Sequence, residues 1–356
     1  MNTFGKKLKI GIFGQSHSDS IGVTIDGLPA GFKIDEQALA AFTARRAPGQ
    51  NSVSTARKEA DKPQIISGLV DGVTCGAVLC AVIKNGDFRS KDYDKIKKVP
   101  RPAHADYPAY VKFDGFNDIR GGGQFSGRLT APLCIAGGIA LQILESMGIY
   151  VGAHVCEIAG VKDEMYHPVD VSKKDFERLG EFPTLSREAA EKMTATILEA
   201  KRHGDSVGGI IECAVIGMDA GYGSPMFEGV ENLISQAVFA IPAVKGIEFG
   251  VGFEASRMMG TQNNDSFVTD GTVVRTKTNN SGGILGGITN GMPIIFRAAF
   301  KPTPSVAAEQ DSINLEDMEN CKLIVEGRHD PCVVPRAVPA VEAAAAVAVL
   351  DMILND

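Results

Sequence analysis

The sequence has no tryptophan and only six histidines among its 356 residues. Its seven cysteines are scattered, their number is odd, and no two of them stand in a CxxC spacing. This pattern argues against a structural zinc site or a disulfide framework and favours a reducing compartment. The net charge is −7, so the overall charge gives no support for a nucleic-acid partner.

Long apolar segments are also lacking. The N-terminal segment MNTFGKKLKIGIFG has no apolar core of the length that a signal peptide needs. The longest apolar run, residues 338–350, is interrupted by Glu342 and is too short to cross a bilayer, so we expect a buried, alanine-rich helix there. These features predict a cytoplasmic protein with no membrane partner.

No linker rich in proline and serine divides the chain, and no fixed-period repeat is present. We therefore expect a single domain over residues 1–356, with the charged segment 161–188 as an exposed insertion. Glycine is abundant, with 40 residues, and runs such as Gly121-Gly122-Gly123 let the backbone approach a ligand closely. Ordinary turns are the alternative explanation for such runs.

Several segments alternate, in part, between apolar and polar residues, which favours antiparallel sheets with one buried face. The predicted strands cover residues 7–13, 21–25, 64–69, 76–83, 207–217, 247–253, 292–300 and 321–326. Helices are predicted after Asp35 and over about 129–147, 187–203, 230–240 and 336–354. The segments 129–147 and 336–354 are apolar on most sides, which is typical of helices enclosed between layers.

The first candidate functional residue is His17, at the polar tip between the predicted strands 7–13 and 21–25. A histidine at the mouth of two strands can be held rigidly and still meet a ligand, and imidazole is the side chain that titrates nearest neutral pH. A surface or hydrogen-bonded structural histidine is the alternative for this position taken by itself.

Four further segments combine charged or hydroxyl side chains with glycine or proline. They are RPAHADY (101–107), RGGGQFSGRLT (120–130), KPTPS (301–305) and GRHDPC (327–332). A glycine-rich loop that leads into a helix offers free backbone N–H groups to an anion. Each segment taken singly could be a turn, an exposed loop or a surface ion pair. Together they indicate a ligand with more than one anionic group, and histidines that carry protons.

These segments occur in the same order in the chorismate synthase family, which the chain resembles over essentially its whole length. The further matching segments are GQSHS with VTIDGLP (14–29), RRAPGQ (45–50), NGDFRSKDY (85–93), GDSVGG (204–209), AVKGIEFG (243–250) and SGGILGGITNG (281–291). The resemblance implies an α+β fold, a layered sandwich with a helical layer between two antiparallel β-sheets, and a homotetramer.

The resemblance also implies an activity. Chorismate synthases convert 5-enolpyruvylshikimate 3-phosphate to chorismate by a 1,4-anti elimination of phosphate that requires reduced FMN. This is the last common step of the shikimate pathway to aromatic amino acids. By this resemblance, His104 is expected to meet the departing phosphate. His17 is expected to keep the reduced flavin in its active protonation state. Asp330 is expected to take part in the proton abstraction.

The implied site residues fall into three groups. The catalytic residues are His17, His104 and Asp330. The residues for the substrate's anionic groups are Arg46, Arg101 and Arg128. The residues at the flavin are Gln124, Phe125, Ser126, Pro242, Ala243, Gly286, Lys301, Pro302, Thr303, Pro304, Ser305 and Arg328.

The chain departs from the family's usual motifs at residues implied to lie near the flavin. The usual GESHG is GQSHS here, with Gln15 and Ser18. The usual GGGRSSARET is GGGQFSGRLT, with Gln124, Phe125 and Leu129. One positive and one negative charge are therefore missing together from the glycine-rich segment.

A further departure concerns the source of electrons. Ser52 stands where an arginine credited with nicotinamide contact is common, which leaves only Arg46 for NADP. We therefore expect NADPH to act at most indirectly, and an external flavin reductase to supply reduced FMN. Two alternatives stay open: a paralogue that binds flavin or an anionic ligand without chorismate synthesis, and a metal-dependent hydrolase that uses histidines. The lack of HxH or HExxH spacing argues against the second.

Overall fold

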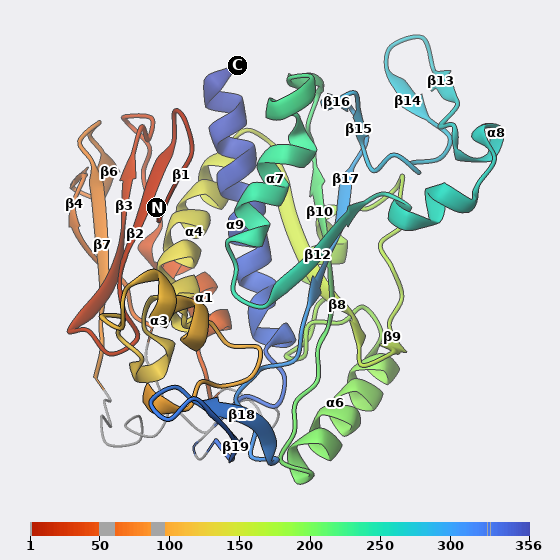
Figure 1. Cartoon of the computed structure of the whole chain (residues 1–356). Helices are drawn as coiled ribbons and strands as arrows, with labels where there is room; N and C mark the ends of the chain where they lie inside the picture. The colour runs from red at the N-terminus through yellow and green to blue at the C-terminus, as the bar shows by residue number, and fades with distance from the viewer. Residues whose placement is uncertain (1, 50–60, 87–96, 326, 328) are drawn as a thin grey trace.

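The computed structural model describes residues 2–49, 61–86, 97–325, 327 and 329–356. In this part of the chain, two five-stranded antiparallel sheets enclose a layer of helices (Figure 1). The predicted α+β sandwich, with helices between two antiparallel sheets, is therefore confirmed.

The first sheet is built from N-terminal strands in the order β1-β2-β3-β7-β4. The strands are β1 (Thr3–Phe4), β2 (Lys9–Gly14), β3 (Ser20–Asp26), β7 (Leu79–Lys84) and β4 (Gln64–Ser67). On β3 the alternating residues Ile21, Val23 and Ile25 are buried against the helices. The predicted segments 7–13, 21–25 and 76–83 correspond to β2, β3 and β7.

The second sheet has the order β12-β17-β10-β8-β9. The strands are β12 (Val244–Phe249), β17 (Ile294–Phe300), β10 (Gly209–Ile216), β8 (Tyr150–Ile158) and β9 (Val161–Lys162). The sequence predicted β10, β12 and β17 but not β8, although β8 pairs with β10 along the whole length of β10. The segment predicted at 247–253 forms a strand three residues earlier and ends at Phe249, because the chain then turns at Gly250 with φ +55°.

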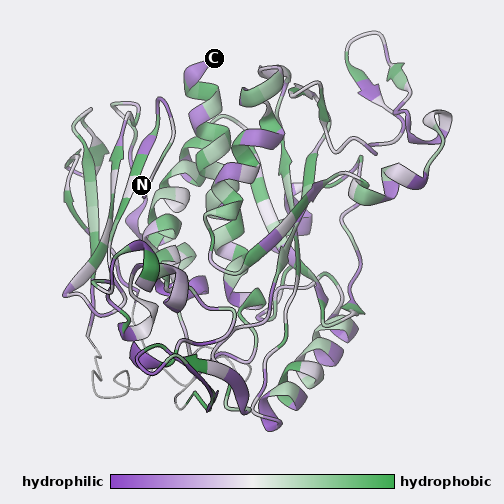
Figure 2. Cartoon of the chain, in the orientation of Figure 1, coloured by the Kyte–Doolittle hydropathy of each residue, from purple (hydrophilic) through white to green (hydrophobic). Residues whose placement is uncertain are grey.

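The helical layer contains α1 (Glu36–Arg46), α4 (Thr130–Ser146), α7 (Val230–Phe239) and α9 (Val334–Asn355). As predicted, Asp35 caps α1, where its carboxylate accepts backbone N–H groups at 2.9 Å. Figure 2 shows α4, α7 and α9 as largely hydrophobic, in contrast to the polar outer helix α6 (Arg187–Arg202). The apolar faces of the layer are covered by the two sheets.

Two helical stretches of the described chain are long and apolar enough to cross a membrane by composition. They cover Gly127–Ser146 and Val334–Asn355, and 72% and 83% of them, respectively, is buried inside the molecule. The predicted buried, alanine-rich helix over 338–350 is therefore confirmed, although the helix is longer than the apolar run. Enclosure between two sheets accounts for its apolar character.

Close packing of α4 against α9 sets the centre of the molecule. A β-carbon added to Gly137 on α4 would lie 2.2 Å from Cβ of Ala343 on α9. The helices therefore touch nearly backbone to backbone at this point. Alanine along α9 (Ala343 to Ala346 are fully buried) allows the approach.

Segment 161–188 is exposed at more than half of its residues, as its charge predicted, but it also packs against the second sheet. It contains β9 and α5 (Lys173–Glu177), and it buries Tyr166 and Val171 in a small cluster with Ala214 and Ile295. The outer face of the second sheet needs an apolar cover, and the few apolar residues of this segment provide it.

The remaining elements are short. The helices are α3 (Asp106–Lys112), α8 (Gly260–Asn263) and the 3-10 turns η2 (Arg120–Phe125), η3 (Gly127–Leu129), η4 (Met226–Glu228) and η5 (Gly252–Arg257). The strands are β5 (Leu69–Val70), β6 (Val73–Thr74), β11 (Ala220–Gly223), β13 (Phe267–Thr269), β14 (Val274–Thr276), β15 (Ile284–Leu285), β16 (Ile288–Asn290), β18 (Gln310–Asn314) and β19 (Glu319–Leu323). They lie around the two main sheets (Figure 1).

Candidate active site

A cavity of about 1070 Å³ lies between the first sheet, the helical layer and the loops that precede α3 and α9. The predicted site residues that line it are His17, Arg46, Arg101, His104, Gln124, Phe125, Ser126, Arg128, Pro242, Ala243, Lys301, Thr303, Pro304, Ser305 and Asp330. The fold thus gathers motifs that are far apart in the sequence into one place.

Some predicted residues are not gathered there. Gly286 lies in the turn between β15 and β16, where its neighbour Gly287 packs against Ser224, and neither it nor Pro302 lines the cavity. Figure 1 places this turn well away from α3 and the first sheet. Arg328 and Ser52 lie outside the described residues.

His17 packs closely against the glycine-rich segment. The backbone N–H of Ser16 donates to the carbonyl of Gly123 at 3.1 Å. Gly121 has φ +59°, and a β-carbon added there would lie 2.4 Å from Cε1 of His17. Any side chain at position 121 would therefore displace the imidazole. At this position glycine is needed for the close approach, and not only for a turn.

His104 belongs to a network centred on Asp106. The Asp106 carboxylate accepts hydrogen bonds from Nε and Nη2 of Arg101 at 2.8 and 2.9 Å, and its Oδ1 lies 2.6 Å from Nδ1 of His104. Burial would raise the pKa of Asp106, but the hydrogen bonds from Arg101 and His104 outweigh it and hold that pKa far below its usual range. Nη1 of Arg101 also reaches Oγ of Ser305 at 3.0 Å.

A second buried carboxylate joins the other two arginines. The side chain of Asp61 has no exposed surface and accepts hydrogen bonds from Arg46 and Arg128, each at 2.7 Å. Nε of Arg128 donates to Oδ1 of Asn85 at 2.7 Å. The two guanidinium groups are thus fixed beside one another at the wall of the cavity.

The KPTPS segment links three parts of the cavity wall. It follows β17, and Nζ of Lys301 donates to the carbonyl of Ala103. Oγ1 of Thr303 donates to the carbonyl of Asp330 at 2.8 Å. The segment therefore ties the loops that carry His104 and Asp330 to the second sheet.

Asp330 is held by an arginine that the sequence did not single out. Its carboxylate forms an ion pair with Nη1 of Arg336, on the first turn of α9. Nε of Arg336 donates to the carbonyl of Arg46 at 3.1 Å. Arg336 therefore couples the carboxylate to the arginine pair on the opposite side of the cavity wall.

The lining of the cavity is of mixed polarity. It combines arginines, histidines and Lys301 with apolar side chains such as Ile10, Ile12, Leu133 and Ile241. Such a lining suits a ligand with a flat apolar ring system and phosphate or carboxylate groups. The chain is acidic overall, so its anion-binding capacity is concentrated here.

Sequence reasoning assigned no role to Asp61, Asp106 and Arg336. Asp106 stood within the RPAHADY motif, and Arg336 followed GRHDPC by a few residues, so position offered a signal for both. Asp61 offered none, because its partners Arg46 and Arg128 are 15 and 67 residues away along the chain. Only the folded chain brings them together.

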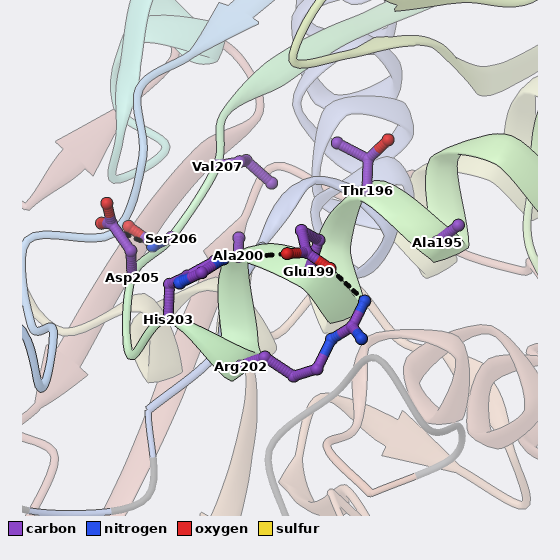
Figure 3. A pocket seen from close by; sticks show the side chains of 9 residues that line it. All are labelled: Ala195, Thr196, Glu199, Ala200, Arg202, His203, Asp205, Ser206 and Val207. Atoms are coloured by element: carbon purple, nitrogen blue, oxygen red, sulfur yellow. Dashed lines mark hydrogen bonds and ion pairs between the residues drawn. The ribbon is translucent and has the colours of Figure 1, made fainter.

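A second, more open hollow of about 630 Å³ lies at the C-terminal end of α6. Figure 3 shows Glu199 there between His203 and Arg202, and Nε2 of His203 is 2.8 Å from Glu199. All three side chains are exposed, and no predicted site residue is among them. This hollow is a solvated helix end.

Comparisons with known proteins agree with the resemblance. The protein-family model described as chorismate synthase matches residues 8–354. A chorismate synthase of Lancefieldella parvula is 47% identical over 99% of this chain and 96% of its own length. One of Korarchaeum cryptofilum is 44% identical over 99% and 97%. A crystal structure of a chorismate synthase superposes with a TM-score of 0.78 at 26% identity and covers 99% of this chain and 93% of its own.

Proposed function

The chain belongs to the chorismate synthase family of lyases, and on that premise we propose that it converts 5-enolpyruvylshikimate 3-phosphate to chorismate with reduced FMN. The observation that carries the proposal is one cavity lined by four arginines, three histidines and Asp330. A substrate with one phosphate and two carboxylates needs such a set of cations.

The residues present fit FMN. The apolar side chains of the lining, Phe125 among them, offer a surface for the isoalloxazine ring, and Lys301, Thr303 and Ser305 offer a cation and two hydroxyls for the phosphate. The cavity, at about 1070 Å³, is as large as the largest typical ligand pockets. The chemistry that reduced FMN supplies when bound is transient electron donation to the substrate.

The chain's own groups bind, orient and move protons. Arg46, Arg101 and Arg128 hold the anionic groups, and the buried carboxylates fix these arginines before the substrate arrives. The C–O bond to phosphate breaks with its electron pair on the leaving group, and His104 gives that group a proton. Loss of a ring proton completes the elimination.

Two further groups have roles in this proposal. Asp330, oriented by Arg336, takes part in the abstraction of the ring proton. His17, held against Gly121, keeps a proton available at the flavin. The arrangement places proton donors and acceptors in a partly enclosed site, where electrostatic interactions are stronger than in water.

The proposal includes an external flavin reductase. Arg46, the residue left for nicotinamide contact, lines the same cavity as Arg101 and Arg128 and is assigned to the substrate with them, so the resemblance leaves no other arginine for a nicotinamide cofactor. Single-domain subunits, a homotetramer and a cytoplasmic location complete the proposal, by resemblance to the family.

The test is an anaerobic assay with dithionite-reduced FMN and 5-enolpyruvylshikimate 3-phosphate. We expect phosphate release and chorismate formation in equal amounts. His104→Ala and Asp330→Ala should each lower kcat by about 100-fold or more while the protein stays folded. His203→Ala is the matched control, because this exposed histidine also pairs with a carboxylate but lies outside the cavity. Absence of turnover with flavin demonstrably bound would reject the synthase and favour a flavin-binding paralogue.

A further inference from the structure

We propose that Asp106 fixes the tautomer of His104, so that Nδ1 keeps its proton and Nε2 is the atom that exchanges a proton in the cavity. The role in catalysis rests on the proposed function, but the tautomer itself does not. Asp106 is thus a positioning residue, which acts through His104 and does not itself touch the substrate.

The position of the proton follows from the distance between the two acceptors. Oδ1 of Asp106 lies 2.6 Å from Nδ1 of His104. If Nδ1 carried a lone pair, two acceptor atoms would face each other at hydrogen-bond distance without a proton between them, which is repulsive. Asp106 is ionised, because hydrogen bonds from Arg101 and His104 overcome the effect of burial on its pKa. The proton therefore resides on Nδ1.

Arg101 does not change this assignment, although its Nη2 lies 3.1 Å from Nδ1 of His104. The same Nη2 lies 2.9 Å from Oδ1 of Asp106, and a carboxylate is the stronger acceptor for a guanidinium hydrogen. Nε and the backbone N–H of Arg101 donate to Oδ2 at 2.8 and 3.0 Å. Arg101 therefore holds the carboxylate in place, with one oxygen directed at the imidazole.

Nε2 of His104 faces the glycine-rich segment. A β-carbon added to Gly122 would lie 3.2 Å from Nε2, so the absence of a side chain at this position leaves the nitrogen accessible. His104 lines the cavity and its side chain is 14% exposed. With Nδ1 committed to Asp106, Nε2 is the atom from which a proton can pass to a leaving group.

The experiment is magic-angle-spinning ¹⁵N NMR of protein labelled at its six histidines, with His104→Gln to assign the signal. At alkaline pH, where imidazole is neutral, wild-type His104 should show a protonated Nδ1 and a bare Nε2. In Asp106→Asn the amide oxygen still accepts from Arg101, which turns the amide N–H toward Nδ1. The proton should then move to Nε2, and kcat should fall about 100-fold or more.

Asp118→Asn is the matched control. Asp118 accepts from the backbone N, Nε and Nη2 of Arg120 in the same three-donor pattern, at 3.1, 2.9 and 2.9 Å, so its carboxylate is directed at Arg120 and not at His104. This variant should leave the tautomer of His104 unchanged.

The outcomes separate the proposals. A wild-type signal with Nε2 protonated would overturn the inference, even if Asp106→Asn did not fold. If His104 kept the same tautomer in Asp106→Asn, the inference would also be overturned. It would likewise be overturned if the proton moved to Nε2 in that variant and kcat stayed unchanged. Since the spectrum needs no substrate, the expected tautomer without any turnover would reject the synthase function and leave the role of Asp106 intact.

Discussion

At the scale of single residues, buried carboxylates fix the positions of the arginine side chains that line the cavity. Asp61 is the clearest case, since its fully buried carboxylate bridges Arg46 and Arg128. Two guanidinium groups next to each other repel, and the carboxylate between them offsets that repulsion while leaving N–H groups for a ligand. The result is an anion site that is formed before its ligand binds.

Asp61→Asn should therefore affect both stability and substrate binding. Breaking a buried ion pair from one side costs about 3–5 kcal/mol, so the free energy of unfolding should fall by an amount of that order. KM for the phosphorylated substrate should rise, because Arg46 and Arg128 are no longer held together. Denaturant unfolding and steady-state kinetics measure the two effects.

Glu254→Gln provides the comparison, since it breaks the ion pair with Arg257, which is exposed on both sides. The free energy of unfolding should change by less than about 1 kcal/mol there. If Asp61→Asn changed the free energy of unfolding as little as Glu254→Gln, the bridge between Arg46 and Arg128 would not stabilise the fold. An unchanged KM in Asp61→Asn would exclude the bridge from substrate binding.

Residue-scale prediction from the sequence succeeded where a motif carried it. His17 and His104 could be predicted because the motifs GQSHS and RPAHADY were recognisable, and both residues line the cavity. Asp61 was not predicted, because a charged residue in a polar stretch gives no indication of its partner, and Arg336 was missed although it follows GRHDPC closely. Ion pairs across 67 residues of chain are a product of the fold and have no local signature.

At the scale of elements, the close contact between α4 and α9 depends on a glycine, which has no side chain to separate the two helices. Gly137 meets the Cα and Cβ atoms of Ala343, at 2.3 and 2.2 Å from an added β-carbon. A β-carbon on its neighbour Gly138 would have side-chain atoms as its nearest neighbours, Cδ1 of Leu39 at 2.7 Å and Cδ1 of Phe42 at 3.0 Å. The first contact is with rigid parts of a helix, and the second is with the ends of flexible side chains.

Gly137→Ala and Gly138→Ala should consequently differ. Each gains about 1 kcal/mol of helix propensity, but overpacking against α9 should cost Gly137→Ala about 1–3 kcal/mol or more. We expect Gly137→Ala to destabilise the protein and Gly138→Ala to be near neutral, as measured by chemical denaturation. Equal effects in the two variants would contradict the claim that α4 and α9 must touch closely.

Sequence patterns predicted the elements that have one covered face or an apolar helical surface. They missed β8, because both its faces are covered and its sequence YVGAHVCEI contains the buried His154 in place of an alternating apolar residue. Segment 161–188 is largely exposed, as predicted, but its packing against the sheet was not predicted. A charged segment can still cover a sheet if a few of its residues, such as Tyr166, are apolar.

At the scale of the whole molecule, the strand orders are the part that local patterns could not predict. The second sheet joins β12, β17, β10, β8 and β9, so β10 and β17 become neighbours although their paired residues, from Gly209↔Phe300 to Val215↔Ile294, are 91 to 79 residues apart in the sequence. Resemblance to a family supplied that architecture, and the apolar helices 129–147 and 336–354 agreed with it. The pairing of β8 with β10 in this sheet also places the buried His154 between the carboxylates of Glu212 and Asp163.

His154 on β8 has no exposed surface, and its Nε2 lies 2.9 Å from Glu212 while its Nδ1 lies 3.5 Å from Asp163. Burial lowers the pKa of His154, but the two carboxylates outweigh it and raise that pKa above the ordinary value. Other groups facing the pair are Tyr166, whose ring packs edge-on against the imidazole, and Arg297, opposite Glu212 on β17. The imidazole thus lies between Glu212 of the sheet and Asp163 of segment 161–188.

A raised pKa in the folded state means that the stabilisation is complete below about pH 6.5 and is lost as the pH rises through the folded value. We expect the free energy of unfolding of the wild-type protein to fall between pH 6.5 and 8, a range in which exposed thiols stay largely protonated. His154→Gln should be less stable at pH 6.5 and should show a flatter profile, because the titrating group is gone. His203→Gln removes an exposed histidine paired with Glu199 and should keep the wild-type slope. Denaturant unfolding at a series of pH values gives all three profiles. A wild-type profile that stays level over this range, or one that His154→Gln leaves unchanged, would show that the imidazole is not charged in the folded protein.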